Sequence, residues 1–265
     1  MAYQNPSYCF LHAAADAGAA SITINGAYNA DYPEDNLIDY RPSSLLKWTA
    51  TATPHRVVID RGAGTREEID RMIIPSGHNM AGEAWELRTN TSDSWGGTTV
   101  ASGTFAAGLV DEVVSGGTEA QRKYQWVRLA MSTGGTALEM GQLFLTHTRT
   151  PTTRGIEPHW EARQVPTLTE IPFPSRSALL SLAQNRWLYR VSYERLESTD
   201  LAVFDNLMTE TGGGLVPFYF IPPDDGDDAL LMRIQDFTRR RQARQSPSAS
   251  GAAFTIDFSM IEQIG

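Results

Sequence analysis

The sequence contains a single cysteine, Cys9, among its 265 residues. One cysteine can form neither an intrachain disulfide nor a thiolate zinc cluster, so the chain suits folding in a reducing cytoplasm. A basic excess is lacking too, because the formal net charge is -9 at pH 7. A surface that follows nucleic-acid phosphates needs such an excess, and we therefore expect no specific nucleic-acid partner.

Long apolar runs are also missing. No segment approaches the ~18 consecutive apolar residues of a membrane-spanning helix, which predicts that the protein does not insert into a membrane. The opening stretch, MAYQNPSYCFLHAAADAGAA, has no basic start and no clean apolar stretch. It therefore makes a poor signal peptide.

Catalytic signatures are absent as well. The five histidines are scattered without HExxH spacing, and no G-x-S-x-G, Walker or G-x-G-x-x-G motif occurs. Neighbouring carboxylates such as Glu67 and Glu68 would alternate across a strand and would not converge on a substrate. The sequence thus predicts a protein that is not an enzyme and has neither catalytic residues nor a cofactor.

What the chain does contain is enough apolar sequence, 41%, for two globular domains. From residue 1 to 148, short β-rich runs alternate with clusters of Gly, Asn, Asp and Thr, which predicts a β-sandwich. The strand candidates are SITING, HRVVID, EIDRMII, AWELRT, YQWVRLA and ALEMGQLFLTHT. The centres of HRVVID and RMIIP are continuously apolar, which is typical of strands that are covered on both faces.

The segment THTRTPTTRGIEPHW interrupts this pattern with threonine, proline and arginine. We place a linker there, over residues 149–159, and a second domain over residues 160–265. Apolar residues alternate in NRWLYRVSYERL, ALLMRIQDF and FTIDFSMI, which indicates strands with one buried face. The second domain is therefore predicted to be mainly β.

One helix is expected in the second domain, within STDLAVFDNLMTETGG. Ser198 or Thr199 is predicted to cap its first N–H groups, and Gly212 to end it in a left-handed conformation. Its apolar stripe consists of Leu201, Phe204, Leu207 and Met208. The helix is expected to pack this stripe on the sheet.

The stretch GGGLVPFYFIPP follows this helix and predicts a strand from Leu215 to Ile221. Pro217 cannot donate a ladder hydrogen bond, which places the strand at a sheet edge or makes Pro217 its start. A bare aromatic edge strand would invite aggregation. We therefore predict that one aromatic face lies in the core and that a neighbouring chain covers the other edge, at Pro217 and Tyr219.

Two charged loops flank the next predicted strand, residues 229–237. PPDDGDD precedes it and RRRQARQ follows it, so about nine residues separate the two loops by roughly 30 Å. Complementary patches at opposite ends of one subunit suit a ring. The alternatives are two solvated turns that keep the protein soluble, and a basic loop that meets DNA in a lumen. The charged residues assigned to a subunit interface are Asp224, Asp225, Asp227, Asp228, Arg239, Arg240, Arg241 and Arg244.

Three stretches give the first domain a family resemblance: DNLIDYRPSSLLKW, RVVIDRGAGTREEIDRMIIPSGHNM and YQWVRLAMSTGGTALEMGQLFL. Over roughly residues 20 to 148 their order and spacing resemble the discoidin, or galactose-binding-like, jelly-roll module. Asn36, Asp39 and Trp48 match its first element, and residues 58–62 and 140–143 match two later ones. The resemblance implies a sandwich whose end loops bind sugars or lipid head groups.

The same resemblance implies a ligand site and a calcium ion. A sugar site would contain Arg41, Trp48, His78 and Asn79, because aromatic faces stack on sugars and polar groups orient them. The alternative, which we favour, is that Trp48 caps the core and Asn79 closes a turn. Asp39 would contribute to the calcium site, but Tyr40 and Gln142 stand where the family has a glycine and an acidic residue. Calcium prefers several oxygen ligands, so the missing carboxylate weakens that site.

The second domain carries another resemblance, in NRWLYRVSYERLESTDLAVFDNLMTETGGGLVPFYFIPPDDG. An alternating aromatic strand, a helix, a glycine stop and Pro-Phe-Tyr-Phe follow one another, which is similar to distal-tail and baseplate proteins of long-tailed phages. The resemblance implies a tail-tube-like β-sandwich or barrel with one packed helix, assembled into rings of three or six.

We accordingly expect a two-domain, mainly β structural protein of a phage tail tip, made in the bacterial cytoplasm and located in the virion. The resemblance implies that its partners are copies of itself and neighbouring tail-tube, hub and tail-tip proteins. The alternative function is carbohydrate binding, in which the jelly roll recognises a host-surface glycan.

Overall fold

The computed structural model describes residues 6–9, 21–24, 27–39, 43–49, 55–62, 68–114, 118, 124–129, 137–151, 159–173, 176–222, 229–241 and 254–263. The chain forms two compact units. Unit 1 contains Met1–Tyr8 and Arg149–Ile264, and unit 2 contains Cys9–Thr148 with Gly265. In the described part of the chain, no helix is long and apolar enough to cross a membrane.

The division between the units differs from the predicted one at the N-terminus. The break between residues 148 and 149 agrees with the sequence, but residues 1–8 belong to unit 1 and not to the jelly roll. The backbone explains this, since Tyr8 and Arg149 exchange two N–H···O=C bonds of 2.9 Å. Strand β1 (Ser7–Cys9) is also the neighbour of β14 in the unit 1 sheet.

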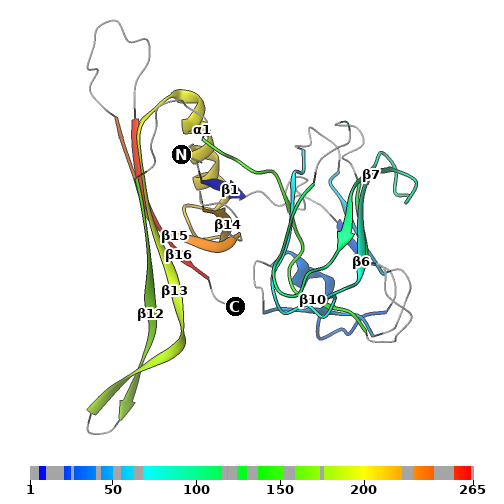
Figure 1. Ribbon diagram of the computed structural model, residues 1–265, viewed down its shortest axis with the longest axis horizontal. Coiled ribbons are helices and arrows are strands. Elements are labelled where there is room, and N and C mark those ends of the chain that lie inside the picture. The colour runs from blue at the N-terminus through cyan, green and yellow to red at the C-terminus, as the bar shows by residue number, and fades with distance from the viewer. Residues whose placement is uncertain are drawn as a thin grey trace, which may run out of the picture. The chain divides into compact units, whose positions relative to one another are not determined.

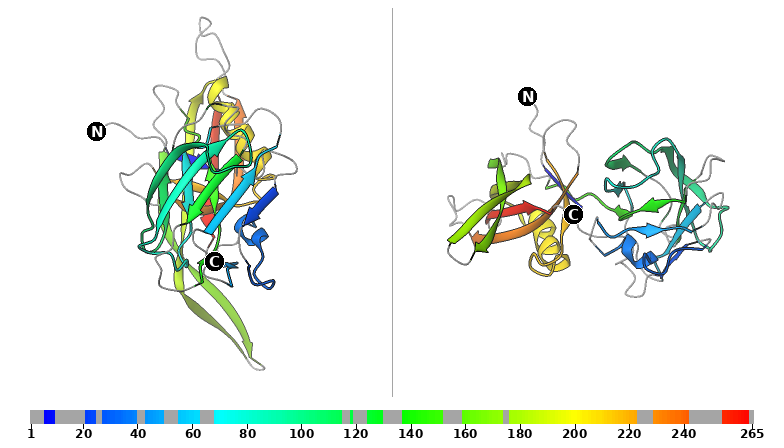
Figure 2. Two further views of the ribbon diagram at one scale, coloured as in Figure 1. Left: turned by 90° about the vertical axis from the view of Figure 1, so that its right-hand side faces the viewer. Right: turned by 90° about the horizontal axis from the view of Figure 1, so that it is seen from below.

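Unit 2 is a sandwich of antiparallel sheets, which confirms the predicted fold class (Figure 2). A five-stranded sheet has the order β2-β4-β9-β6-β7, and a three-stranded sheet has the order β11-β5-β8. Strands β10 and β3 form a small third sheet. The bounds are β2 Ser21–Ile24, β3 Leu46–Lys47, β4 His55–Asp60, β5 Arg71–Ile74, β6 Ala84–Asn90, β7 Thr98–Thr104, β8 Val110–Val113, β9 Tyr124–Leu129, β10 Glu139–Met140 and β11 Phe144–Thr146, with a short 3-10 helix η1 at Glu34–Leu37.

Strand β4 corrects one expectation about this sandwich. Its residues alternate strictly in burial, so His55, Val57 and Ile59 face the core while Arg56 and Val58 are partly exposed. The strand is therefore covered on one face only, although its centre is continuously apolar in sequence. Val58 lies on the partly exposed face, and its apolar character misled the prediction.

Unit 1 contains a six-stranded antiparallel sheet and one α-helix (Figure 1). The strand order is β1-β14-β15-β16-β13-β12. The new elements are β12 His159–Phe173, β13 Arg176–Leu196, α1 Ser198–Glu210, β14 Phe218–Ile221, β15 Leu230–Arg241 and β16 Phe254–Glu262. From β13 onward, strand, helix, strand, hairpin strand and strand follow one another as predicted, whereas β12 was not predicted.

A buried tyrosine pair shows that this sheet is curled into a half-barrel. Strands β1 and β13 are four positions apart in the sheet, which is about 19 Å in a flat sheet. The hydroxyl groups of Tyr8 and Tyr193 are nevertheless only 2.7 Å apart. The Tyr8 ring also lies 5.6–6.3 Å from the rings of Phe204, Phe218, Phe220 and Phe258. These residues form the aromatic core of unit 1.

The helix packs largely as predicted. Leu201, Phe204 and Leu207 are at most 4% exposed, whereas Met208 is only partly buried. The predicted caps are not used, because Ser198 begins the helix and Glu197 at the N-cap position makes no side-chain capping bond. At the other end Gly212, Gly213 and Gly214 all have positive φ, between 57° and 93°.

Strand β14 occupies a different place from the one predicted. It lies between β1 and β15, so it is not a sheet edge, and Tyr219 is 2% exposed. Its cover comes from the chain's own N-terminal strand, and the prediction that a neighbouring chain covers Tyr219 is corrected. Pro217 directly precedes the strand, where its missing N–H costs no ladder bond.

The hairpin of β12 and β13 extends beyond the rest of the sheet (Figure 1). Strand β13 pairs with β16 only from Leu188 onward, whereas it pairs with β12 as far as Phe173 and Arg176. Residues 164–173 and 176–187 therefore form a two-stranded ribbon, with about ten residues and roughly 33 Å in its shorter strand. Strand β12 is also the outer strand of the six-stranded sheet.

Candidate functional site

The four predicted sugar-binding residues do not form a single exposed site among the described residues. Trp48 is 2% exposed, and its ring centroid lies 4.9 Å from that of the buried His55. The Trp48 ring therefore has no open face for a ligand, in agreement with its alternative role as a core residue. Arg41 lies outside the described residues.

His78 and Asn79 are close together but bond to the protein backbone. Asn79 Nδ2 donates to the Ala137 carbonyl, and its Oδ1 accepts from the Glu139 N–H, both at 2.8 Å. These bonds join Asn79 to a segment 58 and 60 positions away, and they do not close a local turn of the kind predicted for Asn79. His78 Nε2 lies 2.9 Å from the Gly108 carbonyl oxygen. Burial lowers the pKa of His78, and the hydrogen bond to Gly108 offsets this only in part.

Asn79 bonds to Glu139, which belongs to a surface that was not predicted from the sequence. Glu139 forms an ion pair of 3.1 Å with Lys47 of the neighbouring strand. The Lys47 ammonium lies 4.6 Å from the centre of the Tyr32 ring. Tyr28, which is bridged to Trp48, and Tyr32 are each 37% exposed. We call Tyr28, Tyr32, Lys47, Asn79 and Glu139 the tyrosine surface. The sequence feature that could have indicated this surface is the pair of tyrosines in AYNADY.

The predicted calcium position stays a prediction. Asp39 is half-buried after η1, and the Gln142 side chain is fully buried. Among the residues that the structure describes, no group of three His, Cys, Asp or Glu side chains is placed to hold a metal ion.

Cys9 is buried, which raises the pKa of its thiol to about 12 and keeps it protonated at neutral pH.

A polar network in unit 2 centres on the partly buried Asp70. Its Oδ1 accepts hydrogen bonds from the Thr148 N–H at 2.7 Å and the Thr148 hydroxyl at 2.8 Å. Its Oδ2 lies 3.0 Å from His147 Nδ1. Burial alone would raise the pKa of Asp70, but the contacts with His147 and Thr148 outweigh it and lower the pKa.

This network predicts a loss of stability in acid. A carboxyl group whose pKa is lowered in the folded state stabilises the fold above its unfolded pKa of about 3.9, and this stabilisation disappears as the pH falls below that value. We expect Asp70→Asn to cost about 1.5 kcal/mol at pH 7, because hydrogen bonds to a charged group are lost. The difference from the native protein should shrink between pH 5 and pH 3, as measured by urea unfolding; a constant difference would contradict it.

The residues predicted as a charged subunit interface are only partly described. Asp224, Asp225, Asp227, Asp228 and Arg244 lie outside the described residues. Arg239 bonds within its own subunit, since its Nη1 donates to Asp205 Oδ1 at 2.8 Å and its guanidinium lies 4.8 Å from the Phe254 ring centre. Arg240 and Arg241, at the end of β15, are exposed.

No protein-family model matches this chain, and no curated protein matches it either. Solved structures do match in part. A chitosan-binding module from a Paenibacillus sp. IK-5 chitosanase/glucanase is 14% identical, with a TM-score of 0.41, over 52% of this chain and 99% of the module. The family 32 carbohydrate-binding module of C. perfringens NanJ is 13% identical, with a TM-score of 0.40, over 54% of this chain and 99% of the module.

A Ruminococcus gnavus GH29 fucosidase in complex with fucose is also 13% identical, with a TM-score of 0.40. The match covers 52% of this chain but only 27% of the fucosidase. About half of this chain is thus similar to these solved structures.

Proposed function

We propose that this protein is a structural component of a long-tailed phage tail tip, in which unit 1 assembles into a ring and contacts neighbouring tail proteins. The observation that carries the proposal is the projecting ribbon of residues 164–173 and 176–187. A two-stranded ribbon is at best marginally stable in water by itself. The ribbon contains only one acidic and two basic residues, Glu170, Arg176 and Arg186, so partner chains are expected to cover it.

Two further features support assembly. The order of strand, helix, glycine stop and aromatic strand, which carries the resemblance to distal-tail proteins, is present in unit 1. Strand β12 also leaves the N–H and C=O groups of one edge unpaired within the described sheet. Such an edge is a template for pairing with another chain.

Removal of the ribbon tests this function. Replacing residues 167–184 with Asn-Gly would join the paired residues Pro166 and Asn185 by a short turn. We expect the native chain to form rings in analytical ultracentrifugation and negative-stain electron microscopy, and the shortened chain to remain a folded monomer. Gold-labelled antibody should mark the tail tip of the virion. A native chain that stays monomeric at high concentration would contradict the proposal.

A second candidate function is glycan recognition, and the tyrosine surface favours it. The exposed ring of Tyr32 could stack on a sugar, while Lys47, Glu139 and Asn79 lie beside it. We expect a glycan-array signal that Tyr32→Ala abolishes. Val113→Ala, at the 76% exposed Val113 of another strand, should leave the signal unchanged. Equal signals from both variants would exclude this surface.

A further inference from the structure

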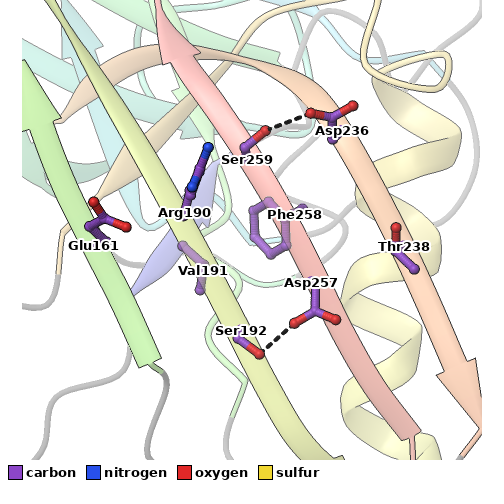
Figure 3. A pocket seen from close by; sticks show the side chains of 9 residues that line it. All are labelled: Glu161, Arg190, Val191, Ser192, Asp236, Thr238, Asp257, Phe258 and Ser259. Carbon is purple, nitrogen blue, oxygen red and sulfur yellow. Dashed lines mark hydrogen bonds between the residues drawn. The ribbon is translucent and has the colours of Figure 1, made fainter. Parts of the chain in front are cut away.

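An open hollow of about 490 Å³ lies on the polar face of the unit 1 sheet (Figure 3). Side chains alternate along β13, so Arg190 and Ser192 face the hollow, while Tyr189 and Tyr193 are buried. The hollow is therefore on the face opposite the aromatic core. Its walls come from the four consecutive strands β12, β13, β16 and β15.

Strand register brings three carboxylates and one guanidinium together in this hollow. Glu161 lies opposite Arg190, Arg190 opposite Ser259, and Ser259 opposite Asp236, in one row across the sheet. Asp257 lies in the next row. The hollow is thus acidic overall, because Arg190 is its single cation among the lining residues.

Serine hydroxyls hold two of these carboxylates in place. Ser192 Oγ donates to Asp257 Oδ1 at 2.5 Å, and Ser259 Oγ donates to Asp236 Oδ2 at 3.3 Å (Figure 3). A hydroxyl orients a carboxylate but carries no charge, so these bonds do not neutralise the hollow. The hollow therefore presents fixed negative charge to a positively charged group.

Exposed positive charge lies on the same strand. Asp236 and Arg240 are four residues apart in β15, on the same face, and about 13 Å apart along the strand. Arg240 and Arg241 make no ion pair within the part of the chain that the structure describes. Each subunit thus carries an acidic hollow and a separate basic end, and the two are complementary.

We propose that Arg240 and Arg241 of one subunit bind in the hollow of a second copy of this chain, against Glu161, Asp236 and Asp257. The inference rests on the proposed ring function and specifies its contact. The two surfaces differ, so each copy binds one neighbour through its hollow and another through its arginines. Repeating such a head-to-tail contact produces a closed ring when the rotations between successive subunits add up to a full turn.

Two charge-reversal variants test this contact. The arginine variant is Arg240→Glu/Arg241→Glu, and the hollow variant is Glu161→Lys/Asp236→Lys. Each should weaken self-association at least about tenfold in analytical ultracentrifugation, because it places like charges opposite one another. The native association should also weaken between about 0.05 M and 0.5 M salt, since salt screens exposed charges. Circular dichroism and thermal unfolding would verify that both variants fold.

Mixing the variants gives the decisive measurement. The arginine variant retains an intact hollow and the hollow variant retains intact arginines, and the two reversed surfaces also carry opposite charges. A 1:1 mixture should therefore assemble, although neither variant assembles well alone. A control, Glu197→Lys/Glu210→Lys, changes the charge of two exposed residues at the ends of α1 and should assemble like the native chain.

The outcomes separate this inference from the function on which it rests. If the native chain assembles and either variant assembles equally well, the contact is wrong and the ring function stands. The contact is also wrong if both variants are monomeric and their mixture remains monomeric. If the native chain itself never assembles, the proposed function fails together with the contact.

Discussion

Tyr8→Ala is expected to destabilise unit 1 by about 3–5 kcal/mol, as large-to-small changes of buried aromatic residues do. The side chain is 0% exposed and touches four aromatic rings from the helix and two strands. Its loss opens a cavity in the aromatic core and loosens β1, which covers β14. Calorimetry should show the unit 1 transition lowered by more than about 10 °C.

Two variants serve as controls for Tyr8→Ala. Tyr8→Phe keeps the ring but leaves the Tyr193 hydroxyl without its buried partner, which should cost about 1–2 kcal/mol. Burial raises the pKa of both Tyr8 and Tyr193, so neither hydroxyl ionises near neutral pH. Tyr32→Ala, in unit 2, should leave the unit 1 transition unchanged. A Tyr8→Ala protein as stable as the native one would show that the N-terminal strand does not belong to this core.

Gly214→Ala is expected to cost unit 1 about 2–4 kcal/mol. Two effects add: φ is 93°, where a side chain is strained, and an added Cβ would meet Ile234 Cβ at 2.9 Å and the Ile234 carbonyl oxygen at 3.1 Å. The backbone oxygen cannot move without disturbing β15. Urea unfolding monitored by circular dichroism measures the loss.

The neighbouring glycine provides a matched control for Gly214→Ala. Gly213 also has a positive φ, 73°, but an added Cβ would meet nothing within 4 Å. Gly213→Ala should therefore show only the conformational cost, about 1 kcal/mol. Equal losses for the two variants would mean that the contact with Ile234 contributes nothing.

Local sequence patterns were sufficient to predict most of the regular elements. Short β-rich runs between turn residues identified β4, β6 and β9 with close bounds. Alternation identified β15 and β16, because a strand with one buried face needs an apolar residue at every second position. Helix α1 was identified by the helical spacing of Leu201, Phe204 and Leu207, which places them on one face, and by the glycines that follow. Composition and these periods determined the mainly β class.

The candidate sites depended on distant partners and were harder to predict. Asn79 was singled out as a ligand residue, but its amide is used by residues 137 and 139. Lys47 and Tyr32 were not singled out, because their proximity to Glu139 follows from the pairing of β3 with β10. The acidic hollow could not be read from the chain either, since its walls come from four strands.

The sequence by itself determined the strand periods, the single helix with its glycine end, and the break near residue 148. Only the tertiary structure decided that the three-residue strand β1 joins the sheet of unit 1, that it covers β14, and that Arg239 is paired while Arg240 and Arg241 are exposed. The physical reason is the separation along the chain between the residues that interact. Periodicity records which side of one element is buried, whereas these outcomes depend on pairing between residues more than 30 positions apart along the chain.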